Sequence, residues 1–202
     1  MSTLQTAAEQ RKQLRRQLLI DTAMSLFSSR GYHNTTVPMI VEASKTSTGS
    51  FYQHFRSKED VLYAAILDFG IRLETSMNEL QTTVSNPQIC MKMMIEQLFM
   101  HLLQDPIGTH LLLIETSGLS ARIHQARIGI LQTHIRKMHQ KLAENIPNLP
   151  EAKLWIASHC ILGSIFQICC ARFDASQDDL TPASEVAQCT SDFLLRAVVS
   201  MN

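Results

Sequence analysis

Residues 36–55 read T-V-P-M-I-V-E-A-S-K-T-S-T-G-S-F-Y-Q-H-F, and this stretch predicts two short helices joined by a tight turn. Thr36 is placed to cap a helix over 37–43, with Pro38 in the first turn, where a missing N–H is tolerated. Ser47 is placed to cap the second helix, which runs to the end of the stretch. Two short helices separated by about three residues form a helix-turn-helix, whose second helix enters the major groove of DNA.

The two short helices carry the apolar and polar residues that this motif requires. Ile40, Phe51 and Phe55 have the spacing to lock the helices together, although such aromatic residues alone fit the core of any helical protein. A helical glycine costs about 1 kcal/mol relative to alanine, and close approach of the backbone to DNA would explain Gly49. The residues expected to contact DNA are Thr36, Lys45, Thr46, Ser47, Thr48, Gly49, Ser50, Tyr52, Gln53, His54 and Lys58.

The N-terminal end of the chain carries an excess of positive charge. The formal net charge of zero argues against a broadly basic nucleic-acid binder, but residues 1–60 hold eight Lys or Arg and five Asp or Glu. Four of these cations, Arg11, Lys12, Arg15 and Arg16, form either a solvated face or a basic arm that touches the adjacent DNA groove.

The rest of the chain also has the apolar periodicity of helices, so the predicted fold is all-α with about nine helices. We expect a three-helix DNA-binding domain over 1–57 and a helical-bundle regulatory domain over 58–202. The helices are predicted over residues 10–30, 37–43, 47–54, 58–83, 88–103, 107–116, 120–145, 151–173 and 182–199.

Three fragments resemble the TetR/AcrR family of bacterial transcription regulators. They are A-x-x-L-F-x-x-x-G-Y from Ala23, T-T-V-x-x-I-x-x-A from Thr35, and S-x-G-S-F-Y-x-H-F-x-S-K-E-D-V-L from Ser47. The match covers about residues 10–65, and the remainder agrees only in helical architecture. The resemblance implies a ligand-responsive regulator, more often a repressor, that binds a palindromic DNA operator as a homodimer.

The sequence departs from the family pattern in the turn and in the second helix. Lys45 and Thr46 stand where the family usually has Gly-Val, so a positive φ at Lys45 would cost about 1 kcal/mol. Thr48 replaces the family's common lysine, which removes one cation and puts the operator sequence in doubt.

The resemblance also implies a ligand pocket among the middle helices and an interface formed by the last two helices of each subunit. We expect a small apolar or amphipathic inducer. The candidate pocket residues are Phe99, Met100, Glu115, Gln125, Trp155, His159 and Gln167. The candidate dimer residues are Ile161, Leu162, Ile165, Ile168, Phe193, Leu194 and Ala197.

Other protein classes are less consistent with the sequence. Motifs for a nucleophilic serine, a phosphate loop or a zinc protease do not occur, so we expect neither an enzyme nor a cofactor or metal site. No apolar run reaches the roughly 18 residues that span a bilayer, and we expect a cytoplasmic protein without a membrane partner. Two alternatives remain: a thiol-based redox regulator, given Cys169 and Cys170, or a helical scaffold that no longer binds DNA.

Overall fold

The computed structural model describes residues 2–79, 86–115, 118–146, 148–174 and 181–200. Within these ranges the regular structure is entirely helical, which confirms the predicted fold class. The helices are α1 (Ser2–Arg30), α2 (Val37–Ala43), α3 (Thr48–His54), α4 (Lys58–Glu79), α5 (Pro87–Gln104), α6 (Pro106–His110), the π-helix η2 (Leu111–Glu115), α7 (Ala121–Asn145), α8 (Glu151–Asp174) and α9 (Ala183–Val199).

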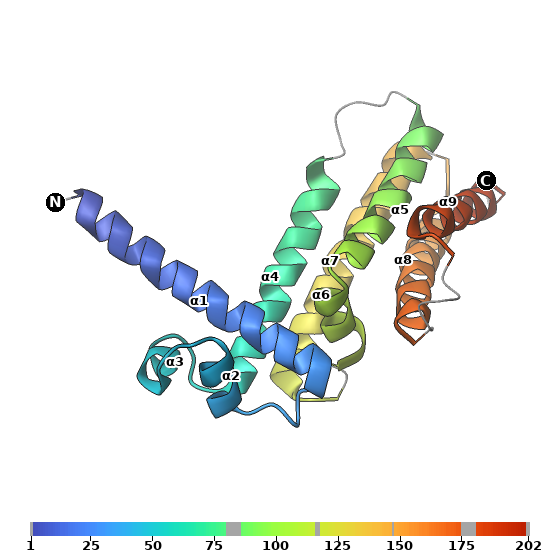
Figure 1. The fold of residues 1–202 in the computed structure, drawn as a ribbon. Coiled ribbons are helices and arrows are strands. Elements are labelled where there is room, and N and C mark those ends of the chain that lie inside the picture. Colours follow the sequence, from blue (N-terminus) through green and yellow to red (C-terminus); the bar gives the residue numbers. More distant parts are fainter. Residues whose placement is uncertain (1, 80–85, 116–117, 147, 175–180, 201–202) are drawn as a thin grey trace.

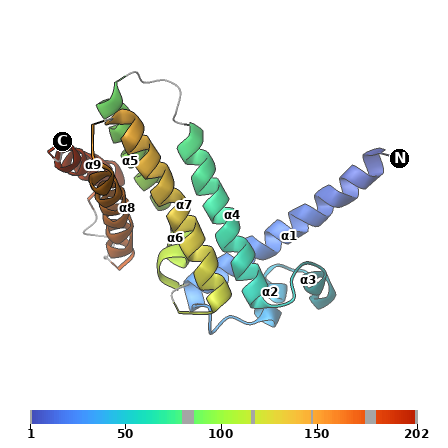
Figure 2. The ribbon, with the colours of Figure 1, turned by 180° about the vertical axis from the view of Figure 1, so that it is seen from behind.

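The two short helices lie at one end of the molecule and the last two long helices at the other (Figure 1). Helix α4 leads away from α2 and α3 and packs against α1, α5 and α7. Helices α8 and α9 cover the far side of the bundle, with α8 against α7 and α9 against α5 (Figure 2). The N-terminal part of α1 extends beyond the bundle.

Helix boundaries follow the local signals in the sequence. Gly31 ends α1 with a φ of +80°, and its N–H donates to the carbonyl of Phe27 at 2.9 Å. The Asn86 side chain accepts from two backbone N–H groups at the start of α5. Ser57 caps α4, since its Oγ accepts from the N–H of Asp60 at 3.2 Å.

The sixth predicted helix differs from the structure in its second half. Residues 111–115 form a π-helical turn, where an uninterrupted α-helix over 107–116 was predicted. The Arg127 Nε donates to the carbonyl of Leu112 in this turn at 2.8 Å. This side chain comes from α7, so the apolar periodicity of the segment did not indicate it.

One continuous core joins the N-terminal helices to the bundle. Ile20, Ala23 and Phe27 on α1 are fully buried, as are the apolar residues of α4 that face them. Leu14 and Leu18 lie earlier on the same helix, and they are 72% and 46% exposed. The first turns of α1 therefore lie outside the core.

Helix α8 changes the expectation about membrane-spanning segments. By length and composition alone, residues 151–173 would suffice to cross a membrane, and this is one such helix among the described residues. Polar residues interrupt the apolar sequence of this helix, so it contains no uninterrupted apolar run long enough to span a bilayer. In the structure, 39% of its most apolar window is buried against the rest of the chain.

The side chain of Lys58 fixes the loop after α1 to the start of α4. Its ammonium Nζ donates to the carbonyls of Tyr32 at 2.7 Å, His33 at 3.3 Å and Thr35 at 2.8 Å. The same ammonium lies 4.3 Å from the centre of the Tyr32 ring. Burial lowers the pKa of Lys58, yet three acceptors hold the charged group in place.

Replacing Lys58 with methionine keeps the apolar stem and removes the charged donor. We expect Lys58→Met to lower the free energy of unfolding by about 2 kcal/mol, because charge-assisted hydrogen bonds are lost and carbonyls are left unpaired. Urea unfolding followed by circular dichroism measures this change. Lys45→Met is the matched control, since Lys45 is exposed; equal stability of the two variants would contradict the role given to Lys58.

His134 on α7 is a buried imidazole with one unpaired nitrogen. The ring is 1% exposed, and its Nδ1 donates to the Ile130 carbonyl at 2.8 Å. Its Nε2 has no hydrogen-bond partner. Burial lowers the pKa of His134, and Lys137 lowers it further, against opposing effects of the Ile130 carbonyl and Glu74. The imidazole is therefore neutral in the folded protein near pH 7.

The lowered pKa of His134 predicts a loss of stability in mild acid. As pH falls below the ordinary value of 6.5, the unfolded chain binds a proton on this residue that the folded chain does not. We expect the unfolding free energy to fall more between about pH 7.5 and pH 5.5 in the unaltered protein than in His134→Leu. Urea titrations at the two pH values test this, and parallel pH dependence in both proteins would exclude it.

Candidate nucleic-acid interface

The predicted helix-turn-helix is formed by α2 and α3. Ile40 on α2 and Phe51 on α3 are fully buried, and Phe55 directly after α3 is 4% exposed. The rings of Phe51 and Phe55 lie 5.9 Å apart. All three residues belong to the hydrophobic core, as expected of side chains that lock the two short helices together.

The turn between α2 and α3 requires a left-handed residue. Lys45 has a φ of +52°, so the strain anticipated for lysine in place of glycine is present. The N–H of Lys45 donates to Glu42 at 3.1 Å, and the N–H of Thr46 donates to Val41 at 3.1 Å. This pattern is a Schellman motif, which normally places glycine at the position of Lys45.

The hydroxyl of Thr46 finds a polar partner inside the turn. Ser44 is buried, and its Oγ donates to the Val41 carbonyl at 3.1 Å. The Thr46 hydroxyl lies 2.9 Å from the Ser44 Oγ, which can accept its proton. Thr46 is thus accommodated where the family usually has an apolar residue, and its hydroxyl is directed toward Ser44.

Helix α3 presents one outward polar face. Thr48, Gly49, Tyr52 and Gln53 are exposed, and Tyr52 retains 55% of its surface. A Cβ at Gly49 would meet only the Ser47 Oγ, at 4.0 Å, so packing within the chain does not require glycine there. A face of small and polar side chains lets the backbone approach a DNA groove closely.

Three residues expected to contact DNA have other positions in the structure. Ser50 is 8% exposed and its Oγ is buried without a hydrogen-bond partner, so it faces the interior. Lys58 is engaged by the loop carbonyls and is not available as a phosphate contact. Ser47 caps α3 by accepting from the N–H of Ser50 at 3.1 Å, as predicted, which directs its Oγ to the helix end.

Thr36 and His54 lie at the edges of the motif. Thr36 occupies the cap position of α2 and is exposed, but its side chain makes no capping hydrogen bond, contrary to the prediction. His54 is half-buried at the end of α3. Burial lowers the pKa of His54, and the cations Lys12, Arg16 and Arg15 of α1 lower it further.

Comparisons with known proteins agree with this geometry. Residues 19–65 match the family model described as bacterial regulatory proteins, tetR family. This part of the chain belongs to the TetR family.

Individual relatives of the chain are similar over the same region. The regulator HbdR from an Aromatoleum species is 42% identical over 52 residues, which are 26% of this chain and 23% of that protein. The repressor KstR2 from Mycolicibacterium smegmatis is 33% identical over 73 residues, 36% of each chain. The aligned parts thus span about a quarter to a third of these relatives.

The whole fold has close structural counterparts. The regulator FadR from Bacillus subtilis, solved with stearoyl-CoA, superposes with a TM-score of 0.75 at 19% identity, covering 89% of this chain and 97% of that one. At this identity the likeness establishes that the TetR-type fold extends through the C-terminal helices.

The candidate ligand residues do not converge on one pocket. Phe99 is fully buried core and Met100 is half-buried beside it, whereas Gln167 is exposed on α8. The side chain of Glu115 lies outside the described residues. Gln125 lines a groove of about 440 Å³ between α4 and α7.

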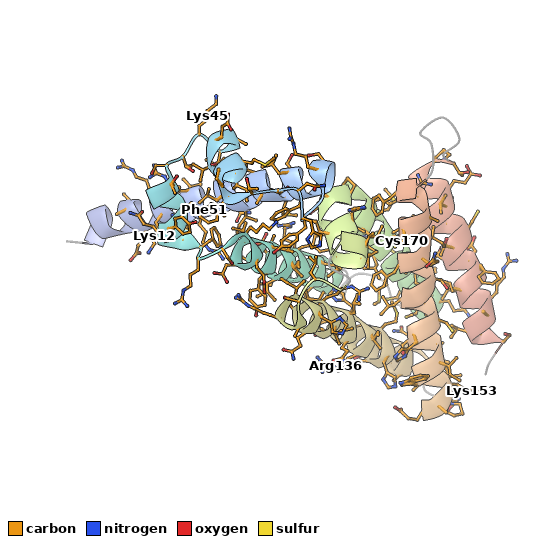
Figure 3. The ribbon with its side chains drawn as sticks, turned by 90° about the horizontal axis from the view of Figure 1, so that it is seen from below. Lys12, Lys45, Phe51, Arg136, Lys153 and Cys170 are labelled. Atoms are coloured by element: carbon orange, nitrogen blue, oxygen red, sulfur yellow. The ribbon has the colours of Figure 1, made fainter. Side chains whose placement is uncertain are left out.

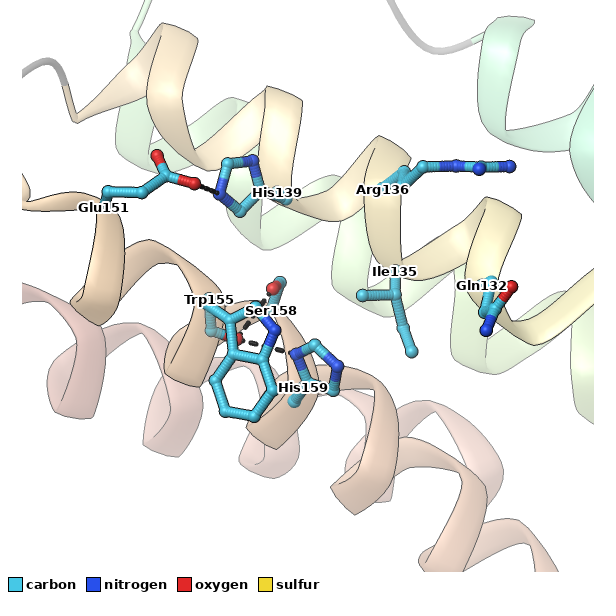
Figure 4. A pocket seen from close by; sticks show the side chains of 8 residues that line it. All are labelled: Gln132, Ile135, Arg136, His139, Glu151, Trp155, Ser158 and His159. Atoms are coloured by element: carbon cyan, nitrogen blue, oxygen red, sulfur yellow. Dashed lines mark hydrogen bonds and ion pairs between the residues drawn. The ribbon is translucent and has the colours of Figure 1, made fainter. Parts of the chain in front are cut away.

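Trp155 and His159 line a second groove, of about 410 Å³, between α7 and α8 (Figure 4). Their rings stack with centres 4.1 Å apart, and Trp155 is 58% exposed. At one end of this groove, His139 pairs with Glu151 at 3.0 Å. Figure 4 shows Arg136 and Gln132 at the other end.

The candidate dimer residues divide between the core and the surface. Ile161, Leu162, Ile165 and Leu194 are buried inside the chain, so they are not free to contact a second subunit. Ile168 is half-buried, and Phe193 and Ala197 are exposed. Both sides of α8 are apolar, so the sequence did not distinguish the core stripe from the exposed one, on which Ile156 lies.

Sequence analysis missed the polar junction between α4 and α7. The Arg122 guanidinium pairs with the Asp60 carboxylate and also lies 4.0 Å from the centre of the Tyr63 ring. The Ser120 Oγ donates to Glu59 at 2.9 Å. These partners are about sixty residues apart, and no local pattern indicates such pairs.

The left-handed turn at Lys45 yields a stability prediction. We expect Lys45→Gly to raise the free energy of unfolding by about 1 kcal/mol, because glycine adopts this backbone conformation without strain. Urea unfolding measures the gain. Lys45→Ala is the control, since it removes the same charge and keeps the strain; a gain as large in Lys45→Ala would show that charge is the cause.

Proposed function

We propose that this TetR-family chain is a DNA-binding transcription repressor that acts in the cytoplasm as a homodimer on a palindromic operator. The observation that carries this proposal is the exposed polar face of α3, held on a helix-turn-helix that matches the TetR family model. Repression is supported by the relative KstR2, which is described as a repressor. In this proposal residues 1–57 read DNA, and residues 58–202 bind the ligand and the second subunit.

Exposed apolar surface on α8 and α9 supports the dimer. Ile156 on α8 is 45% exposed, and Phe193 and Val199 on α9 are 70% and 47% exposed. Covering these side chains in a second copy would remove apolar surface from water. A two-fold dimer also places two recognition helices on successive major grooves, which face the same side of DNA about 34 Å apart.

Contacts between α4 and α6 connect the proposed regulatory part to the helix that directly follows the proposed DNA-binding part. The Arg72 Nη2 donates to Asp105 at 2.7 Å, and the other oxygen of Asp105 caps α6. Gly108 of α6 lies so close to Phe69 of α4 that an added Cβ would approach the ring to 2.3 Å. A shift of α6 would therefore displace α4, which is joined to α3 by only three residues.

We propose a small apolar or amphipathic inducer that binds beside α4 or α7 and favours a state with lower DNA affinity. A ligand shifts the two states only if it binds them differently. The grooves beside α7 are of the size that small molecules occupy. That the structurally similar FadR was solved with stearoyl-CoA supports an amphipathic ligand class.

The redox alternative receives less support from the cysteines of α8. Cys169 is fully buried, and burial raises the pKa of Cys169 to about 12. Its thiolate, which is the reactive form, is therefore scarce at neutral pH.

Substitutions on the two sides of α3 test the DNA-binding proposal. We expect Tyr52→Ala and Gln53→Ala each to weaken operator binding about tenfold or more, because a base or phosphate contact contributes about 1–3 kcal/mol. The operator is first selected from random duplex DNA, and fluorescence anisotropy then gives the dissociation constants.

Ser50→Ala is the matched control, because Ser50 lies on the same helix but faces the interior. We expect its operator affinity to stay within about twofold of the unaltered protein. If no sequence is enriched during selection, or if Ser50→Ala alone weakens binding, the proposed reading face of α3 is wrong.

A further inference from the structure

The face of α1 that packs on the core becomes basic where the helix leaves the core. Ile20 is fully buried, and Lys12 and Arg16 lie eight and four residues before it, on the same side of the helix. Arg15 directly precedes Arg16 in the chain. We call Lys12, Arg15 and Arg16 the basic stripe.

The basic stripe lies beside the end of α3. The Arg16 guanidinium is 5.2 Å from the centre of the Phe55 ring, and Phe55 directly follows α3. All three cations act on His54, the last residue of α3, because each opposes its protonation. Figure 3 shows Lys12 next to the two short helices, with Lys45 projecting from another edge of the same motif.

Cations of this part of α1 lie on the side nearer α3 as well as on the outer side. A solvated helix carries its charges on the side away from the protein. Here that side carries Arg11 together with the exposed Leu14 and Leu18, whereas the basic stripe lies on the side nearer α3. Within the part of the chain that the structure describes, none of the three cations takes part in an ion pair.

The helical form of this segment decides which part of DNA it can reach. Helix α1 is continuous from Ser2 to Arg30. An α-helix with side chains is about 10–12 Å wide, and the minor groove is only about 6 Å wide. The segment therefore cannot enter the minor groove as an extended arm, and a helix beside the recognition helix meets the sugar–phosphate backbone.

We propose that the basic stripe is a second DNA-contacting element that binds phosphates flanking the bases read by α3. This inference rests on the proposed function, since it takes α3 as the reading helix. Phosphate contacts carry no sequence information, so the stripe adds affinity and fixes how the dimer sits on the duplex. It also raises the salt dependence of binding, because each neutralised phosphate releases counterions.

The test measures the salt dependence of DNA binding for the full chain. The variant Lys12→Gln/Arg15→Gln removes two cations and keeps Arg16, which stacks on Phe55. Anisotropy titrations over a salt series use two duplexes, a selected operator and a scrambled duplex. We expect the slope of log K against log salt to become shallower by about 1.8 per protomer on both duplexes. Affinity near 0.15 M salt should fall at least about tenfold.

Two matched variants separate charge at this position from charge elsewhere on the helix. Arg30→Gln removes an exposed cation from the other end of α1 and should leave the slope unchanged. Lys12→Arg/Arg15→Lys keeps both charges and should retain the slope of the unaltered protein.

An unchanged slope in Lys12→Gln/Arg15→Gln on both duplexes would overturn the inference. If the slope is unchanged and the variant sediments as a smaller species than the unaltered protein, the inference is wrong and the basic stripe contacts a second copy of the chain instead. The scrambled duplex tests the basic stripe even if the protein prefers no sequence. A protein that shows no operator preference would therefore contradict the role proposed for α3, and the slope on the scrambled duplex would still decide the role of the stripe.

Discussion

The ammonium of Lys58 organises the N-terminal third of the protein. It donates to the carbonyls of Tyr32, His33 and Thr35 in the loop after α1, and it belongs to the first residue of α4. The loop, the end of α1 and the start of α4 are thereby held at one point. Helices α2 and α3 lie between these fixed ends in the chain, so the orientation of α3 depends on hydrogen bonds outside its exposed face.

The same arrangement fits the proposal that α4 links ligand binding in the bundle to the DNA-binding helices. At one end it is joined to the DNA-binding helices through Lys58, and along its length it meets α6 and α7 through polar pairs. Helix α7 in turn separates two grooves that share Arg136 at their rims. A ligand bound in either groove would contact α7, which forms an ion pair with α4. The bundle thus offers a short mechanical path, whichever groove is used.

Much of the fold could be derived from the sequence because its helix signals are local. The bounds of α2 and the cap of α3 by Ser47 follow from residues within one turn of each other. The directions of Ser50 and Lys58 could not be derived in this way. Lys58 lies more than twenty residues from its carbonyl acceptors, and a lysine beside a DNA-binding helix has the same local pattern whether it binds phosphate or backbone.

The C-terminal helices show a second limit of local patterns. Helix α8 is apolar on more than one side, so Ile161 and Ile156 look equivalent in the sequence, although one is core and the other is exposed. Candidate ligand residues failed to converge for a related reason. Trp155 and Phe99 were both predicted to line the ligand pocket, and only the packing of the helices assigns one to a groove and the other to the interior.

Gly49 has a consequence for how such a protein can change over time. The space around its α-carbon is open, and Thr48, Tyr52 and Gln53 on the same face of α3 are exposed. Substitutions there carry little cost in folding, whereas the residues that set the angle of α3 are buried or bound to backbone. The specificity of the reading surface can therefore diverge between descendants of one gene while the scaffold beneath it stays the same.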